Sequence, residues 1–244
     1  MNRFRKTIGA AGVALVTTLA VPGGLSPVLG QPVEGAFDPL TAYGPEIRFS
    51  VWRKGDRIGD HRVQFRRDGD RLDVEIDFQA RVRFLGITAY LFEYQSSAAW
   101  QGATLLSLDA TVDDDGTQGA VSARRYGQDV VVEGTRGLRR LAGPLYPSNH
   151  WHPGVIGQTR ILNTLTGGIG DVEMELVGRE MVATAHGEIA ADRYLFSGDL
   201  QDVDVWYDSE GRWVKLRFLT EGGELIEYRC ERCRAANETA EYRQ

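Results

Sequence analysis

The sequence predicts an all-β domain: a single strongly curved antiparallel sheet, or open half β-barrel, of about ten to twelve strands with one short helix. Three observations lead to this prediction. Apolar and polar residues alternate from Glu46 onward, turn residues recur at short intervals, and no long segment has helical periodicity. Such a sheet cannot leave a broad apolar face in water, so that face must be covered or must hold something apolar.

Residues 72–79 give the clearest strand. Leu, Val, Ile and Phe occupy the even positions, while Asp, Glu, Asp and Gln occupy the odd ones. Because successive side chains of a strand point to opposite faces, this segment has one apolar face and one solvated face. The three acidic residues Asp73, Glu75 and Asp77 are therefore interpreted as a solvated surface.

Short turns separate the other predicted strands. Lys54-Gly55-Asp56, Asp68-Gly69 and Asp115-Gly116 are typical of hairpin turns. The candidate strands are residues 47–51, 63–65, 72–78, 90–100, 105–112, 120–126, 130–133, 172–177, 188–197, 203–207, 213–219 and 225–230. The helix is expected over Gly154–Asn163, inside the least strand-like stretch, residues 137–166.

The N-terminus has the pattern of a secretory signal peptide. Arg3, Arg5 and Lys6 precede fifteen uncharged, mostly apolar residues, 7–21, which is shorter than the roughly 20 residues of a membrane span. We therefore expect residues 1–30 to be removed and the chain to be periplasmic or extracellular, with an uncleaved anchor as the alternative. Residues 31–45 are expected to be a flexible lead-in, 46–234 a single β-rich domain and 235–244 a tail.

The charge balance restricts the partners. The chain has a formal charge of −6, and removal of residues 1–30, which carry three basic and no acidic residues, makes the balance −9. Nucleic-acid binding needs clustered Lys and Arg, so nucleic acid is not expected as a partner. Anionic membrane surfaces are disfavoured as a general partner, and no membrane span is expected in the mature chain.

The two cysteines and the His-x-His segment are the candidate redox or metal residues. Cys230 and Cys233 follow a predicted strand without a helix pattern after them, which favours a structural disulfide over an active redox pair. His150 and His152 could join these cysteines in a zinc site, but nothing in the sequence brings the two segments together. Neither a metal nor a cofactor is predicted, and His61 and His186 are expected at the surface.

Catalytic motifs are missing from the sequence. It contains no Gly-x-Ser-x-Gly elbow, no glycine-rich phosphate loop and no His-Glu-x-x-His segment. Whether the chain is an enzyme stays open, with the balance against it.

Residues 203–219 have the most distinctive local chemistry. Trp206 and Trp213 fall on opposite sides of the turn Ser209–Arg212, which predicts a hairpin with paired aromatic rings. These rings either pack structurally or line a ligand cavity. If a cavity exists, Trp100, Trp206 and Trp213 are the candidate ligand contacts.

The same hairpin resembles a family of exported bacterial proteins known only as domain of unknown function 6134. The matching residues are Tyr194, Gly198, Trp206-Tyr207-Asp208, Gly211, Trp213, Phe218, Ile226 and Tyr228, with Trp151, Leu162-Asn163-Thr164 and Gly167 upstream. His152 stands where asparagine is expected, and the cysteine pair is outside the pattern. The resemblance implies export and a β-rich fold but no known reaction.

These observations favour a non-enzymatic envelope protein whose curved sheet binds or carries an apolar or amphipathic small molecule or lipid. The alternative is an envelope scaffolding or interaction module with an unidentified protein partner. An extracytoplasmic enzyme is the third hypothesis.

Overall fold

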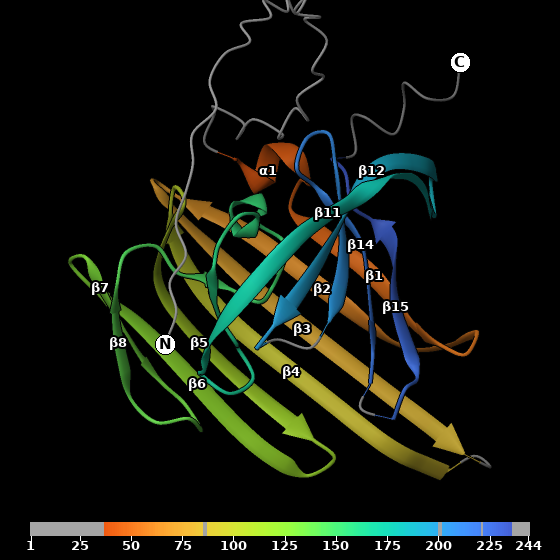
Figure 1. Cartoon of the computed structure of the whole chain (residues 1–244), viewed down its shortest axis with the longest axis horizontal. Helices are drawn as coiled ribbons and strands as arrows, with labels where there is room; N and C mark the ends of the chain where they lie inside the picture. The colour runs from red at the N-terminus through yellow and green to blue at the C-terminus, as the bar shows by residue number, and fades with distance from the viewer. Residues whose placement is uncertain (1–36, 85–86, 200–201, 221, 236–244) are drawn as a thin grey trace, which may run out of the picture. The chain divides into compact units, whose positions relative to one another are not determined.

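A computed structural model describes residues 37–84, 87–199, 202–220 and 222–235 of the chain (Figure 1). The predicted signal peptide and the tail from residue 236 lie outside these ranges, as do residues 31–36 of the lead-in. Everything below concerns the described residues.

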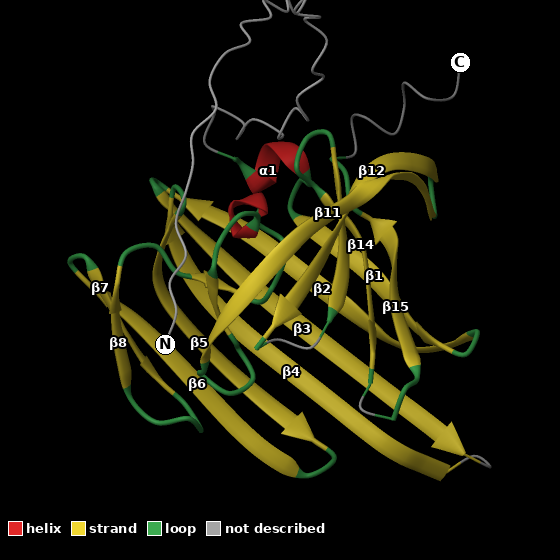
Figure 2. Cartoon of the chain, viewed as in Figure 1, coloured by secondary structure: helices red, strands yellow, loops and turns green. Residues whose placement is uncertain are grey.

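These residues form a 15-stranded sheet with one short α-helix (Figure 2). The elements are α1 (Pro39–Ala42), β1 (Glu46–Arg53), β2 (Asp56–Asp68), β3 (Arg71–Phe84), β4 (Ile87–Gln101), β5 (Thr104–Asp114), β6 (Thr117–Tyr126), β7 (Asp129–Glu133), β8 (Arg139–Ala142), β9 (Tyr146–Pro147), the 3-10 helix η1 (Pro153–Val155), β10 (Arg160–Leu162), β11 (Ile169–Thr184), β12 (Gly187–Gly198), β13 (Val203–Asp208), β14 (Trp213–Leu219) and β15 (Leu225–Arg232).

The strand order follows the sequence almost without interruption. Strands β1 to β8 lie side by side in chain order, β15 to β9 do the same, and β1 pairs with β15. All pairs are antiparallel except β9 with β10. The edges of the sheet are therefore β8 and β9, which only three residues of chain, Gly143–Leu145, separate.

The predicted fold class is confirmed, but the strand count of ten to twelve is too low. Each of the twelve expected strands corresponds to one of the longer strands. The three additional strands, β8, β9 and β10, have four, two and three residues and lie in the stretch expected to be irregular. Strands this short have no room for a visible alternation.

The position of the helix also differs from the prediction. Residues 154–163 form η1 and β10, because Pro153 starts only a single 3-10 turn. The α-helix is α1, which the Asp38 side chain caps by accepting a hydrogen bond from Leu40 N. The next residue, Tyr43, is fully buried, so the domain begins before Glu46 and the end of the expected lead-in belongs to it.

Two glycines let the edge regions of the sheet approach each other. A Cβ added to Gly134, just after β7, would lie 2.6 Å from Thr166 O and 2.9 Å from Gly167 Cα. At the same place Arg136 N and Thr135 Oγ1 both donate hydrogen bonds to Thr166 O. Backbone contacts thus join the end of β7 to the turn between β10 and β11, although β8 and β9 are not paired.

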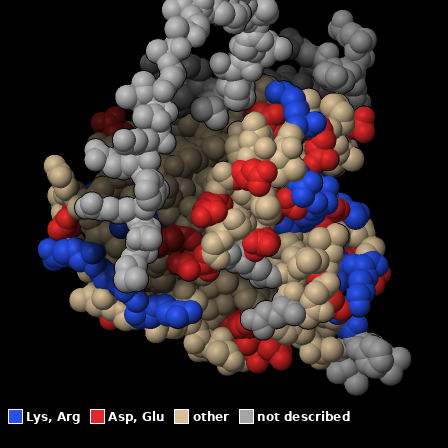
Figure 3. Space-filling model, viewed as in Figure 1, with Lys and Arg blue, Asp and Glu red and all other residues tan. Residues whose placement is uncertain are grey.

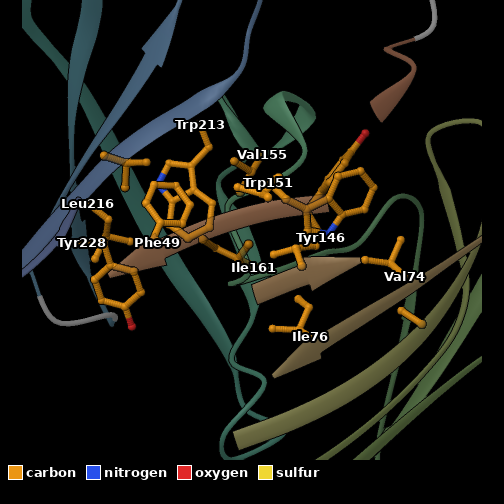
Figure 4. Packing of buried hydrophobic residues seen from close by; sticks show 14 of the residues in the cluster. Phe49, Val74, Ile76, Tyr146, Trp151, Val155, Ile161, Trp213, Leu216 and Tyr228 are labelled. Atoms are coloured by element: carbon orange, nitrogen blue, oxygen red, sulfur yellow. The ribbon is translucent and has the colours of Figure 1, made fainter. Parts of the chain in front are cut away.

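Residues 145–164, called the inner segment below, comprise the short strands β9 and β10 and the chain with η1 between them. They pack against the concave side of the long strands (Figure 4). Leu145, Trp151, Val155 and Ile161 are almost completely buried. Figure 4 shows Trp151, Val155 and Ile161 beside residues that the sheet contributes, such as Phe49, Ile76 and Val74. The inner segment therefore fills part of the sheet's concave side.

The outer half of the β11–β12 hairpin bends back over neighbouring strands. The register shifts between Leu176 and Gly178, where Gly178 has φ +154°. Beyond this irregularity β11 contacts β14 and β15, and Ala185 N at the hairpin tip donates a 3.0 Å hydrogen bond to Cys230 O. The hairpin thereby covers the outer face of the sheet near β13 to β15.

Candidate functional site

Aromatic side chains fill one half of the sheet's inner face. Trp100, Trp151, Trp213, Phe49 and Tyr43 are each at most 2% exposed. Trp213 packs on Phe49 with ring centroids 4.2 Å apart, and Trp100 packs edge-on to Trp151 at 5.4 Å. Figure 4 shows this packing from β1 and β14 to the inner segment. This half of the concave side is an ordinary hydrophobic core.

Two buried tyrosine hydroxyls hold the inner segment in place. The Tyr207 hydroxyl donates to His150 O at 2.9 Å. The Tyr43 hydroxyl donates to Trp151 O at 2.9 Å and accepts from Trp213 N at 2.8 Å. Gly211, with φ +75°, faces Pro153, and a Cβ at Gly211 would lie 3.1 Å from that ring. The residues that carry the family resemblance therefore fix the inner segment to the β13–β14 hairpin.

An ion pair stabilises the turn of that hairpin. Asp208 Oδ2 lies 2.7 Å from Arg212 Nε, and Asp208 Oδ1 accepts from Arg212 N and Glu210 N at 3.0 Å. Both side chains are almost completely buried. A buried charge requires a partner and further hydrogen bonds, and this turn supplies both. The pair is a structural feature of the hairpin.

The histidines of the inner segment are buried but do not share a site. His150 packs against Phe196 and Trp213, whereas His152 stacks on Trp100, with centroids 5.6 Å apart. His152 Nδ1 accepts a hydrogen bond from Gly154 N and so caps η1. Within the described ranges, no three His, Cys, Asp or Glu side chains are grouped in a way that could hold a metal ion. The zinc site considered from the sequence is therefore not formed by these residues.

His61 was expected at the surface and lies in the core instead. It sits on the inner face of β2 opposite Phe49, and its ring contacts Trp213 at 5.4 Å and Phe78 at 5.7 Å. Neither of its ring nitrogens has a hydrogen-bond partner in the described part of the chain. His61 shares the inward parity of Val63 and Phe65 on β2, so the alternation of the strand, had it been applied to His61, would have predicted its burial.

Burial lowers the pKa of all three histidines. Desolvation, which disfavours the charged imidazolium, lowers the pKa of His150 and of His152 to about 4. It lowers the pKa of His61 to about 3, with a smaller contribution from nearby His150. The rings are therefore neutral at neutral pH.

The three predicted ligand contacts do not lie together around an open cavity. Trp100 and Trp213 are in the filled half of the inner face and are fully buried. Trp206 and Trp213 are not a cross-strand pair, because a register shift between Trp206 and Tyr207 places Trp213 opposite Tyr207. Trp206 instead faces outward. The hairpin itself was predicted correctly, but a bulge cannot be read from the alternation alone.

Trp206 is enclosed by charged groups on the outer face. Its Nε1 donates to Glu180 Oε1 of the folded-back β11 at 2.6 Å. The cationic groups of Arg193, Lys215 and Arg217 lie 5.6, 4.9 and 5.3 Å from the ring centroid. Such cation–π contacts stabilise a buried ring in a polar layer. Trp206 is a packing residue for the hairpin.

The two cysteines lie at the end of β15. Cys230 and Cys233 form a disulfide in the structure, with Cα atoms 5.9 Å apart and both residues buried. They lie next to the tip of the β11–β12 hairpin, where this hairpin packs on the outer face of the sheet.

The other half of the inner face is incompletely covered. Fourteen of the described apolar side chains pack against the core but stay partly exposed, and five of them lie on β3, β4, β5, β13 and β14: Phe78, Phe92, Val112, Val203 and Phe218. Phe78 stacks on buried Tyr228 with centroids 5.7 Å apart and contacts Phe92 at 5.4 Å. We call these five residues the open apolar row. Each lies at an inward position of its strand, so the alternation of apolar and polar residues already indicated that these side chains face inward.

Figure 3 shows acidic and basic side chains gathered on the lobe at the right and a band of basic side chains at the lower left.

The outer face of the sheet carries a second groove of about 1020 Å³, whose lining also includes Phe78 and Val112. It crosses β2 to β6 and also touches β1 and β15. Its lining includes Arg48, Arg62, Asp77, Glu93 and Gln118. Charged residues of both signs and apolar residues are all present, so the groove suits a ligand with polar and apolar parts. Sequence reasoning assigned this face only to solvent.

The fold and the site together define a barrel-like all-β protein with a filled half and an open half. The chain belongs to the family described as Domain of unknown function (DUF6134), whose model matches residues 49–231. The resemblance inferred from the sequence is thereby confirmed.

A solved structure has a similar fold. It is the crystal structure of a β-barrel-like protein of Domain of Unknown Function DUF1849 from Brucella abortus, with 10% sequence identity and a TM-score of 0.57. The similarity covers 81% of this chain and 98% of that chain. At this identity the likeness concerns the fold alone.

No curated protein matches the chain. Among the described residues, no helix combines the length and the apolar character that crossing a membrane requires.

Proposed function

We propose that this chain is an exported, non-enzymatic protein that holds the apolar part of an amphipathic molecule against the open apolar row. The observation that carries the proposal is the division of one inner face into two halves. Where the inner segment packs on the face, large side chains such as Trp100 and Trp213 are almost fully buried. Where it does not, residues of the same alternating pattern remain partly exposed.

The physical argument rests on the cost of exposed apolar surface. Each Å² of apolar surface removed from water contributes roughly 25 cal/mol, so a row containing three phenylalanines gains substantially from a cover. The strands β3, β4 and β5 supply Phe78, Phe92 and Val112 on one side, and β13 and β14 supply Val203 and Phe218 on the other. A ligand between these strands would complete the core that the inner segment completes elsewhere.

Mass spectrometry of lipids extracted from the natively purified chain tests the proposal, together with titration of an apolar fluorescent probe. We expect the variants Phe92→Ser and Phe218→Ser to bind the probe about tenfold more weakly each, since burying a Phe side chain contributes about 1.5–3 kcal/mol. Tyr126→Ser is the matched control, because Tyr126 is an exposed aromatic residue of β6. A chain that carries no lipid and binds no apolar probe would refute the proposal.

The outer groove favours a second candidate, an interaction module of the cell envelope. A photo-reactive cross-linker placed at Gln118 in cells should then capture one consistent protein partner. The same cross-linker at Tyr126, beyond the groove, should not. Capture of many unrelated proteins from both positions would speak against this candidate.

A further inference from the structure

Outward-facing residues along β3 change from acidic to basic. After Arg71, which pairs with Asp73, come Glu75 and Asp77; Gln79 follows, and Arg81 and Arg83 complete the series. These residues share one face because side chains of a strand alternate. The chain as a whole is negatively charged. A separate basic region at one end of the strand is therefore a local feature of this face.

A cavity of about 590 Å³ lies at that basic end. Five basic residues line it, Arg53, Lys54, Arg57, Arg81 and Arg83, and two acidic ones, Asp56 and Asp60. It adjoins the larger outer groove, with which it shares Arg57, Asp60 and Gln79. The basic cavity is thus one end of a continuous polar surface.

Three of the five basic residues are already held by carboxylates. Lys54 Nζ lies 2.6 Å from Glu224, which also pairs with Arg53. Arg57 pairs with Asp60 and, at 3.0 Å, with Glu231. These pairs neutralise much of the charge and fix the wall that the β1–β2 turn contributes.

Arg81 and Arg83 differ from the other three. No ion pair or hydrogen bond of their side chains is formed with the described part of the chain. Arg81 is nevertheless partly buried beside the cavity. Two guanidinium groups two residues apart on one strand are separated by about 7 Å along the backbone, close enough to act on one ligand.

We propose that the basic cavity binds a phosphoryl group, with Arg81 and Arg83 as its principal contacts. A guanidinium group presents a planar set of N–H donors that matches the oxygens of a phosphate, and such charge-assisted hydrogen bonds are stronger than neutral ones. Arg57 and Lys54 line the same cavity, with their charge largely balanced by Asp60, Glu231 and Glu224. The phosphoryl group belongs either to a free anion or to the headgroup of a phospholipid.

Arg81 and Arg83 face outward from β3 whereas Phe78 faces inward, and none of the five residues of the open apolar row lines the basic cavity. The phosphoryl site therefore does not depend on the proposed apolar ligand. A variant at one site should leave binding at the other unchanged, so either proposal can fail alone.

Two titrations of the full-length purified chain test the phosphoryl site. In the first, isothermal calorimetry measures binding of inorganic pyrophosphate, with chloride at equal ionic strength as the reference. In the second, co-sedimentation compares vesicles of phosphatidylcholine containing phosphatidylglycerol with vesicles of phosphatidylcholine alone. Binding in the first arm identifies a free phosphate anion as sufficient, whereas binding only in the second identifies a lipid headgroup as the source.

The double variant Arg81→Gln/Arg83→Gln should weaken whichever binding is observed by tenfold or more. Arg66→Gln is the control, because Arg66 lies near the acidic end of the same outer face and pairs with Asp73. The apolar probe of the previous section should bind the double variant normally, which also verifies its fold. Absence of binding in both arms, or equal binding by the double variant and the wild type, would overturn the proposal.

Discussion

A single hydroxyl group, that of Tyr43, joins three parts of the domain. Tyr43 directly follows α1. Its hydroxyl accepts a hydrogen bond from Trp213 N at the start of β14 and donates one to Trp151 O of the inner segment. Tyr43 is fully buried, and this burial raises the pKa of its hydroxyl far above the ordinary value, so it stays protonated. The residue acts as a neutral donor and acceptor.

Replacing Tyr43 by Phe should therefore cost about 2–4 kcal/mol of unfolding free energy, because two buried backbone groups each lose a partner. Urea denaturation followed by tryptophan fluorescence measures the change. Tyr126→Phe, at an exposed tyrosine, is the control and should change stability by less than about 0.5 kcal/mol. Equal effects of both variants would contradict the bridging role.

The buried histidines make stability dependent on pH. An unfolded histidine titrates near pH 6.5, whereas folding lowers the pKa of His150 and His152 to about 4 and that of His61 to about 3. Between these values the unfolded chain binds protons that the folded chain does not. The free energy of unfolding therefore falls as the pH falls from 6.5 to 4, by about 3 kcal/mol for each of His150 and His152.

His61→Leu offers the cleanest test of this pH dependence, since neither nitrogen of His61 has a hydrogen bond to lose within the described part of the chain. The variant should be at least as stable as the wild type at pH 7 and should lose about 2–3 kcal/mol less between pH 7 and 4.5. Chemical denaturation at both pH values measures this difference. His186→Gln, at an exposed histidine, should follow the wild type. An unchanged acid loss in His61→Leu would exclude His61 as a contributor.

The sequence analysis identified residues that matter to the fold, but it assigned some of their side chains to the wrong face of the sheet. The sequence pattern marked the Trp206–Trp213 hairpin correctly, yet the register shift beside Trp206 and Tyr207 pairs Trp213 with Tyr207, so the two tryptophan rings lie on opposite faces. His61 was misplaced for a different reason: its hydropathy suggested the surface, while its odd-numbered position on β2 set it inward with Val63 and Phe65. Position within an alternating strand was the better guide.

At the scale of elements, length decides what the sequence can reveal. The twelve long strands were predictable because five or more residues show the two-residue period. The short strands β8, β9 and β10 form because tertiary contacts hold them, as when β9 pairs in parallel with β10 through Tyr146 and Ile161. No local pattern in the sequence encodes such contacts.

The backbone at the end of β7 can approach the β10–β11 turn closely because Gly134 and Gly167 have no side chains. Gly134→Ala should destabilise the domain by about 1–3 kcal/mol, because its new methyl group would press on Thr166 O and Gly167. Thermal unfolding by circular dichroism measures the loss. Gly222→Ala is the control, since an added Cβ there has no neighbour nearer than 3.7 Å. If Gly134→Ala is as harmless as the control, the backbone contact does not help to close the sheet.

At the scale of the whole domain, one sheet presents two different chemical surfaces. The inner face is apolar and half covered, whereas the outer face is polar and changes from acidic to basic along β3. Because successive side chains of a strand point to opposite faces, alternate residues of the same strands form the two surfaces. An apolar ligand inside and a phosphoryl group outside are therefore compatible with each other without being linked.

The strand order makes the ends of the domain neighbours. β1 pairs with β15, and Ala235 N donates a 3.2 Å hydrogen bond to Ala42 O. The middle of the sequence, by contrast, forms the edges of the sheet and the buried inner segment. We therefore expect the domain to tolerate new chain ends in an exposed turn better than a break in the inner segment.

A circular permutant tests this asymmetry. Joining residue 235 to residue 37 by a short flexible linker and opening the chain in the exposed β2–β3 turn at Gly69 should preserve the β-type circular dichroism spectrum. Its unfolding free energy should stay within about 2 kcal/mol of the original. A second permutant with the same linker, opened between His150 and Trp151, should lose cooperative unfolding, because those residues accept the Tyr207 and Tyr43 hydrogen bonds. If this second permutant unfolds as cooperatively as the first, the inner segment is not an essential part of the core, and the division of the inner face into a filled and an open half loses its basis.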